Sequence, residues 1–244
     1  MGTGPADVAW CAADPHFEAG DGALAVFHRW LDDFAARGPE TLVLLGDLFS
    51  AWVALPAALS AEQREAVDHL AALGPRGRRL VFLVGNRDYF VEALRPSAFA
   101  VVAERWDLDL PGGGRVRFEH GDLVNTSDRA YLRWRLLSRS AAVSGLVRVL
   151  PGGLQRRFAL RLERAMAPTN REYKATFPQA ELARWAQAAR AEGCTAAVLG
   201  HFHLDRTEAV EGLTVRFAPQ FREEGAFLVL REDGSHDLRR AAAP

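Results

Sequence analysis

Five short polar motifs occur in a fixed order along the chain, and each directly follows an apolar run typical of a buried strand. The motifs are Asp14-Pro15-His16, Gly46-Asp47, Gly85-Asn86-Arg87-Asp88, His120-Gly121-Asp122 and Gly200-His201-Phe202-His203. In open α/β sheets, ligands bind beyond the carboxyl ends of the strands. The order of the motifs therefore predicts an α/β protein with one polar site assembled from distant parts of the sequence.

The segments between the motifs predict two mixed β-sheets packed face to face, with helices outside. Over the first 84 residues, strand-like runs alternate with amphipathic helical segments, at 8–13, 21–37, 41–45, 61–73 and 79–84. Ser60 is the expected N-cap of the second helix. A glycine-rich turn then predicts an antiparallel hairpin of 105–110 and 115–119. The remaining expected elements are a helix at 178–192 and strands at 194–199, 215–218 and 226–230.

We expect all 244 residues to form a single domain, 1–244, because this length is usual for one larger α/β domain. Residues 128–165 are predicted to form two helices, interrupted at Leu150-Pro151-Gly152-Gly153. We interpret residues 125–175 as a helical lid inserted over the polar site.

The predicted lid is strongly basic. Between Arg129 and Lys174 there are 11 basic and two acidic residues. Such a segment indicates an anionic partner, which is a membrane surface, a nucleic acid or a phosphorylated substrate. The alternative is a solvated helix face in an arginine-rich chain.

Targeting signals are not evident in the sequence. No apolar run reaches the roughly 18–20 residues that span a bilayer, and the first residues lack the pattern of a secretory signal. Cys11 and Cys194 both lie in strand-like segments, so we expect small buried residues rather than a disulfide. These observations favour the cytoplasm.

The motifs supply the ligand set for two divalent metal ions about 4 Å apart. The candidate ligands are Asp14, His16, Asp47, Asn86, His120, His201 and His203. An extended backbone would aim Asp14 and His16, two residues apart, to the same side. We assign to the first metal Asp14, His16, Asp47 and His203. We assign to the second metal Asp47, which is expected to bridge, together with Asn86, His120 and His201.

A metal pair of this kind acidifies a bridging water and favours in-line attack at phosphorus. Oxygen and imidazole donors suit Mn, Fe, Zn or Mg. The remaining histidines, His28, His69 and His236, lie outside the motifs and are expected to be structural.

The five motifs resemble those of the calcineurin-like metallophosphoesterase superfamily, over nearly the whole chain. Residues 46–52, residues 85–90 and the His120 motif are similar to one branch, the UDP-2,3-diacylglucosamine pyrophosphatases. The resemblance implies a four-layer sandwich and two divalent ions, usually Mn²⁺. It also implies cleavage of a lipid-linked UDP-sugar to UMP and 2,3-diacylglucosamine 1-phosphate. That reaction belongs to lipid A biosynthesis, at the cytoplasmic face of the inner membrane, where the protein would contact an anionic surface peripherally.

Arg87 strengthens the resemblance to this branch, because many superfamily members have a histidine after the asparagine. Arginine is no general acid near neutral pH, but it can hold a phosphate leaving group bidentately. The catalytic residues that the resemblance implies are Asp47, Asn86, Arg87 and His120. The substrate contacts that it implies are Asn86, Arg87, Asp128, Tyr131, Asn170, Lys174 and His201.

Two other classes of function stay open at this stage. The chain could be a phosphoesterase of the same superfamily that acts on another nucleotide, phosphodiester or lipid phosphate. It could also be a non-catalytic scaffold, although such scaffolds generally lose metal ligands. A nucleic-acid partner is not expected, because the net charge is only −1. The sequence does not indicate an oligomeric state.

Overall fold

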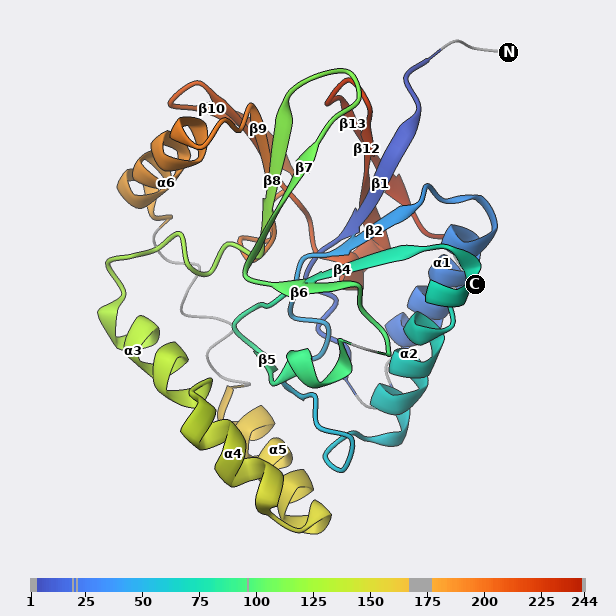
Figure 1. Ribbon diagram of the computed structural model, residues 1–244, viewed down its shortest axis with the longest axis vertical. Helices are drawn as coiled ribbons and strands as arrows, with labels where there is room; N and C mark the ends of the chain where they lie inside the picture. The colour runs from blue at the N-terminus through green and yellow to red at the C-terminus, as the bar shows by residue number, and fades with distance from the viewer. Residues whose placement is uncertain (1–3, 19, 21, 96, 167–176, 243–244) are drawn as a thin grey trace.

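A computed structural model of the chain describes residues 4–18, 20, 22–95, 97–166 and 177–242 (Figure 1). Its largest element is a six-stranded sheet in the order β13-β12-β1-β2-β4-β6. The strands are β1 (Asp7–Ala12), β2 (Thr41–Leu44), β4 (Arg79–Leu83), β6 (Val101–Ala103), β12 (Ala226–Arg231) and β13 (His236–Arg240). The four strands from β1 to β6 in this order are parallel, whereas β12 is antiparallel to both of its neighbours.

The second sheet has five strands in the order β10-β11-β9-β8-β7. They are β7 (Arg105–Asp109), β8 (Arg115–Glu119), β9 (Ala196–Leu199), β10 (Arg206–Val210) and β11 (Leu213–Phe217). The predicted hairpin is confirmed as the antiparallel pair β7–β8, and β9 lies parallel to both β8 and β11. A short third pair joins β3 (Trp52–Val53) to β5 (Asp88–Tyr89). Strands β3, β5, β6, β10 and β13 were not predicted from the sequence.

Helices cover the outer faces of both large sheets (Figure 1). On the six-stranded sheet these are α1 (Gly22–Arg37) and α2 (Ala61–Ala71), and on the five-stranded sheet α6 (Gln179–Ala191). The predicted N-cap is confirmed, since the Ser60 hydroxyl accepts a 3.1 Å bond from the Gln63 backbone. Shorter helices are η1 (Gly74–Arg76), η2 (Val91–Leu94) and α7 (Phe221–Glu224).

Side-chain alternation along the central strands builds two cores, one on each face of the six-stranded sheet. In β1, Trp10 and Ala12 pack with the residues of α1, whereas Ala9 and Cys11 pack between the two sheets. This period of two is expected for a strand that is buried on both faces. Both cysteines are buried and unbonded, as predicted. The architecture is thus the predicted helix–sheet–sheet–helix sandwich.

The prediction of two helices in the basic segment is wrong, because the structure has three. They are α3 (Arg129–Ser138), α4 (Ala141–Val149) and α5 (Gly152–Met166). The extra break occurs at Arg139, after which the Ser140 hydroxyl caps α4 by accepting a 3.3 Å bond from the Val143 backbone. Val147 of α4 packs in a core cluster with Val53 and Tyr89 of β3 and β5.

Within the described part of the chain, no helix combines the length and apolar character needed to cross a membrane.

Glu119, at the end of β8, is a buried acid with few polar neighbours. Its carboxylate accepts a 3.1 Å bond from the Trp185 indole, and the Arg117 guanidinium is 3.9 Å away. Burial raises the pKa of Glu119 from 4.5 to about 7. The folded protein therefore binds the proton on Glu119 more tightly than the unfolded chain does.

We predict that Glu119→Gln removes a loss of stability at alkaline pH. Between about pH 4.5 and 7 the unfolded Glu119 ionises while the folded one stays protonated, so rising pH favours unfolding of the wild type. Glutamine keeps an acceptor for Trp185 but cannot ionise. Urea unfolding followed by tryptophan fluorescence measures the free energy of unfolding of both proteins. The value for the variant minus that for the wild type should rise by up to about 3 kcal/mol from acidic to alkaline pH. If the difference in free energy of unfolding between the two proteins does not change with pH, the raised pKa of Glu119 is contradicted.

Candidate metal centre

The seven predicted ligands lie at the carboxyl ends of five strands, where the two sheets meet. Asp14 and His16 follow β1, Asp47 follows β2, and Asn86 follows β4. His120 follows β8, and the pair His201 and His203 follows β9. Because the ligand-bearing strands run parallel within each sheet, their carboxyl ends share an edge, and the two edges face each other.

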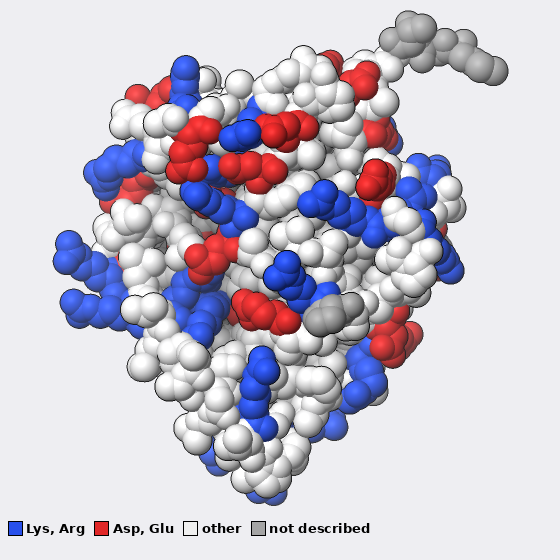
Figure 2. Space-filling model, viewed as in Figure 1, with Lys and Arg blue, Asp and Glu red and all other residues white. Residues whose placement is uncertain are grey.

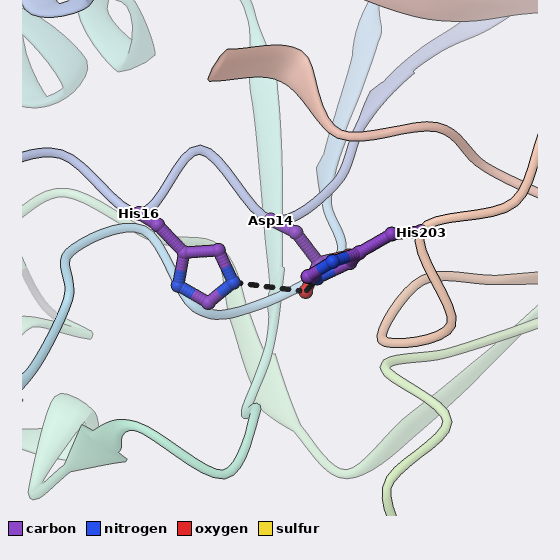
Figure 3. A group of neighbouring side chains, drawn as sticks. All are labelled: Asp14, His16 and His203. Carbon is purple, nitrogen blue, oxygen red and sulfur yellow. Dashed lines mark ion pairs between the residues drawn. The ribbon is translucent and has the colours of Figure 1, made fainter. Parts of the chain in front are cut away.

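One group of ligand atoms surrounds Asp14 (Figure 3). Its Oδ1 atom lies 3.7 Å from Nε2 of His16 and 3.5 Å from Nε2 of His203. The imidazole rings of His16 and His203 reach it from different loops, with centroids 5.4 Å apart. This group contains three of the four residues assigned to the first metal, and the fourth, Asp47, lies in the second group.

A second group contains Asp14, Asp47 and His120. The Asp47 Oδ2 atom lies 3.7 Å from Nε2 of His120 and 3.9 Å from Nε2 of His16. Asp14 belongs to both groups, whereas the second-metal assignment did not include it. The Asp47 carboxylate lies near a histidine of each group, and its bridging role stays a prediction. Asn86 adjoins the second group, with its Oδ1 atom 3.1 Å from Nε2 of His120. The His201 ring lies 5.1 Å from the His120 ring between centroids.

These residues fit divalent cations. Donors around one ion with bonds of about 2.1 Å lie roughly 3–4 Å apart, close to the spacing observed. Asp14 Oδ1 is buried and has no hydrogen-bond partner among the described residues, and the same holds for Nδ1 of His16 and of His203. A buried carboxylate oxygen without a donor is costly unless a cation balances it. The identity of the residues as ligands remains our prediction.

The electrostatics of the site favour positive charge. Burial alone would lower the pKa of His120, but the charges of Asp47 and Asp14 outweigh it and raise that pKa to about 9. Burial lowers the pKa of His16 to about 3 and that of His201 to about 4, so both are neutral imidazoles at pH 7. Neutral imidazole is the form that binds metal ions. The Nδ1 atom of His120 lies 2.6 Å from the Leu45 carbonyl, which orients the ring and directs Nε2 toward Asp47.

The prediction that an extended backbone aims Asp14 and His16 is wrong. Both have positive φ angles, 50° and 45°, in the left-handed region that residues with side chains rarely adopt. The same is true of Asp47, His201 and His203. Left-handed backbone at a non-glycine residue costs of order 1–3 kcal/mol, and such residues cluster at functional sites. The ligands are thus aimed by tight turns after each strand.

Two glycines allow the ligand loops to approach each other closely. A Cβ atom at Gly85 would overlap the Asp47 carboxylate and lie 2.9 Å from Cε1 of His120. Gly46 has a φ of 84°, and a Cβ there would lie 2.8 Å from Nδ1 of His120. Side chains at either position would push the ligands apart.

Asp88 is a site residue whose role the sequence analysis did not assign. Its Oδ2 atom accepts 2.8 Å bonds from the backbone of Asp47 and of Gly85, so it joins the loops after β2 and β4. Burial and the nearby Asp47 charge raise the pKa of Asp88 to about 7. The feature of the sequence that could have identified Asp88 is its position as the last residue of the third polar motif. Gln220 is also near the site, with Nε2 3.2 Å from Nε2 of His203, and nothing in the sequence marked it.

Arg87 is buried beside the ligands. Its Nη1 donates a 2.8 Å bond to the Ser50 carbonyl, and Nε lies 3.7 Å from Oδ2 of Asp47. Its backbone N–H also donates to the Asp47 carboxylate.

The substrate contacts predicted in the lid are only partly within the described chain. The Tyr131 hydroxyl donates to Asp122, and the Asp128 carboxylate caps α3 through the Tyr131 backbone, at 2.9 Å. Asn170 and Lys174 lie outside the described residues.

The calcineurin-like phosphoesterase family model matches residues 9–205, and the chain belongs to this family. It is thus a hydrolase of the metallophosphoesterase class, which uses divalent metal ions.

Two relatives share the same name. A protein of Neisseria meningitidis serogroup B, UDP-2,3-diacylglucosamine hydrolase, is 27% identical over 212 residues, which are 86% of this chain and 87% of the relative. A protein of that name from Klebsiella pneumoniae is 33% identical over 153 residues, 62% of each chain. Among solved structures, an archaeal phosphodiesterase has a similar fold, with a TM-score of 0.50 over 95% of this chain and 98% of that chain, at 12% identity.

We predict that Mn²⁺ stabilises the folded protein through this centre. At a free concentration of about 100 times its Kd, a ligand that binds only the native state adds about 2.7 kcal/mol to the free energy of unfolding. Replacing Asp47 by alanine should abolish most of this gain, because Asp47 contacts both groups of ligands. Thermal unfolding with and without Mn²⁺ measures the effect. His69→Gln, at a half-buried histidine paired with Asp32 and outside the polar motifs, is the control and should keep the full gain. Equal stabilisation of the Asp47 variant would place the metal elsewhere.

Proposed function

We propose that this protein hydrolyses the pyrophosphate of UDP-2,3-diacylglucosamine, giving UMP and 2,3-diacylglucosamine 1-phosphate for lipid A biosynthesis. The observation that supports this substrate most directly is the similarity, over 86% of the chain, to a protein named for it. The ligand cluster supports the reaction class. Mn²⁺ is the metal that we propose for the centre.

The chemistry of the substrate fits the residues around Asp47. Whichever phosphorus atom water attacks, the leaving group is a phosphate monoester, which needs charge stabilisation more than protonation. Divalent ions at the centre would supply Lewis acidity toward the phosphoryl oxygens and acidify the attacking water. The fixed positive charge of Arg87, next to Asp47, is suited to stabilise the charge that develops on the leaving group.

We predict that Arg87→Ala lowers kcat by about 10²–10³-fold, the usual effect of losing one group that stabilises developing charge. Lysine at this position should recover only part of the activity, because it lacks the bidentate guanidinium. UMP release from UDP-2,3-diacylglucosamine with Mn²⁺ measures the rate, and calorimetric titration shows whether Mn²⁺ still binds. The variant should bind Mn²⁺ as the wild type does. A kcat within about twofold of the wild type would exclude this role for Arg87.

UDP-glucosamine and bis-p-nitrophenyl phosphate, assayed in parallel, test the substrate itself. Rapid hydrolysis of the acylated substrate alone supports the lipid A reaction. Activity on the small diester alone would leave a phosphoesterase with a different substrate and reject the lipid proposal.

The proposed substrate is a lipid, and helices α3 to α5 present a surface suited to a membrane. Apolar side chains on α3 and α4 are largely exposed, namely Trp134, Leu136, Leu137, Leu146 and Val149, at 50%, 78%, 61%, 64% and 78%. Figure 2 shows uncharged and basic surface where α4 and α5 form one tip of the molecule. Exposed apolar groups next to arginines bind anionic bilayers peripherally. We therefore propose that residues 125–175 act as the lid and contact the cytoplasmic face of the inner membrane.

We predict that Leu146→Asp with Val149→Asp weakens binding to phosphatidylglycerol vesicles by at least about tenfold, because apolar area is lost and negative charge is added. Co-sedimentation of the protein with the vesicles measures the change. Ala180→Asp with Ala188→Asp, at two exposed positions on α6, is the matched control and should bind like the wild type. Unchanged binding of the double variant would show that another surface contacts the lipid.

A further inference from the structure

Arg135 of α3 and Arg139, the residue that directly follows α3, bind the loop that joins β4 to β5. This loop contains Asn86 and Arg87. Arg135 and Arg139 are four residues apart, so they lie on the same face of the helix end. That face is directed at residues 84–88, which are about 50 positions earlier in the chain.

Arg139 contacts both ends of the Asn86-Arg87 pair. Its Nη2 atom donates a 2.6 Å bond to the Gly85 carbonyl and a 3.0 Å bond to the Asp88 carbonyl. Its guanidinium also lies 4.9 Å from the centre of the Tyr89 ring, at the distance of a cation–π contact. The carbonyls on either side of Asn86 and Arg87 are therefore held by one planar group.

Arg135 fixes the same loop from a deeper position, with only 4% of its surface exposed. It donates to the carbonyls of Val84 and Gly85, at 3.3 and 3.4 Å. Its charge is balanced by Asp122 at 2.7 Å and by Glu104 at 3.1 Å. Asp122 belongs to the His120 motif, so Arg135 connects the loop of Asn86 to the loop of His120.

The loop that the arginines hold places Asn86 and Arg87 against the candidate metal ligands. The Asn86 Oδ1 atom lies 3.1 Å from Nε2 of His120, and the Arg87 backbone donates a 2.8 Å bond to the Asp47 carboxylate. The loop is also held through Asp88, whose carboxylate accepts bonds from the backbone of Asp47 and Gly85. The Arg87 carbonyl accepts a further 2.8 Å bond from the Trp52 backbone. A shift of the loop by 1 Å would move Asn86 and Arg87 relative to both candidate metal groups.

We propose that Arg135 and Arg139 are positioning residues for phosphoester hydrolysis, which hold the 84–88 loop so that Asn86 and Arg87 keep their places at the metal centre. This inference rests on the proposed role of that loop in the active site. It makes α3 a fixed part of the centre, although α3 belongs to the segment interpreted as a lid.

The test compares Arg139→Ala with Arg133→Ala, at an exposed arginine of α3, in the 244-residue protein without lipid. We expect Arg139→Ala to lower kcat for bis-p-nitrophenyl phosphate by about 10–100-fold with little change in KM, since small misplacements of catalytic groups have effects of this size. Mn²⁺ affinity, from calorimetric titration, should fall about tenfold, as it does when groups that orient ligands are removed. Arg139→Lys should recover part of both, and Arg133→Ala should match the wild type.

A purely structural role would give a different result. Arg139→Ala would then lower the melting temperature, while the folded protein kept the kcat and the Mn²⁺ affinity of the Arg133→Ala control. That outcome overturns the proposal. Arg135→Lys is a second variant, which preserves the positive charge opposite Asp122 but loses hydrogen bonds to the loop carbonyls. It should also lower both kcat and the Mn²⁺ affinity. If the wild type fails to hydrolyse any phosphoester, the proposed function fails, and the Mn²⁺ titrations still decide whether the arginines position the loop.

Discussion

One oxygen of the Asp14 carboxylate accepts a 2.7 Å hydrogen bond from the backbone of His201, and the other faces nitrogens of His16, His120 and His203. Asp14 follows a strand of one sheet, whereas His201 follows a strand of the other. The contact therefore joins the two halves of the sandwich at the edge where all the candidate ligands converge. The 2.6 Å contact of the His120 ring with the Leu45 carbonyl crosses between the sheets at the same edge, so the two contacts together fix the relation of the sheets there.

Several features of the site lower the free energy of unfolding, and the rest of the fold must offset them. It contains left-handed backbone at five ligands, buried carboxylates at close range and the buried imidazoles of His16 and His120. The offset comes from the cores on both faces of the six-stranded sheet, which place the ends of β1, β2 and β4 side by side. Stability and site geometry are thus divided between different parts of the same strands, with apolar residues along their length and polar residues at their ends.

The sequence predicted those features that depend on local pattern. The periodicity of β1, β2 and β4 and the cap at Ser60 are local, and so is the position of each ligand directly after a strand. Edge strands such as β10 and β13 escaped prediction, because half-exposed polar strands lack an apolar run. The break after α3 escaped although Ser140 is a good cap residue, because the apolar periodicity continues across it.

The conformation of the ligand loops could not be predicted in the same way. The turns that give Asp14 and His16 positive φ angles are imposed by pairing with the Asp47 loop, through bonds such as that of the His16 backbone to the Asp47 carbonyl at 3.0 Å. Arg135 and Arg139 likewise bind backbone carbonyls about 50 residues away. Every residue has a backbone carbonyl, so the residue types do not reveal these contacts.

The attachment of α3 to the 84–88 loop distinguishes α3 from α4 and α5. The two parts of this segment differ in how far their sequence can vary without moving the metal centre. Arg135 and Arg139 bind main-chain oxygens that every sequence provides, so α3 could remain in place while its outward face is redesigned. Helices α4 and α5 contact the sandwich through apolar packing near β3 and β5 instead. Under the proposed lid role, an exchange of residues 141–166 between members of the family would change the substrate that is accepted, while the contacts of Arg135 and Arg139 with the 84–88 loop stayed the same.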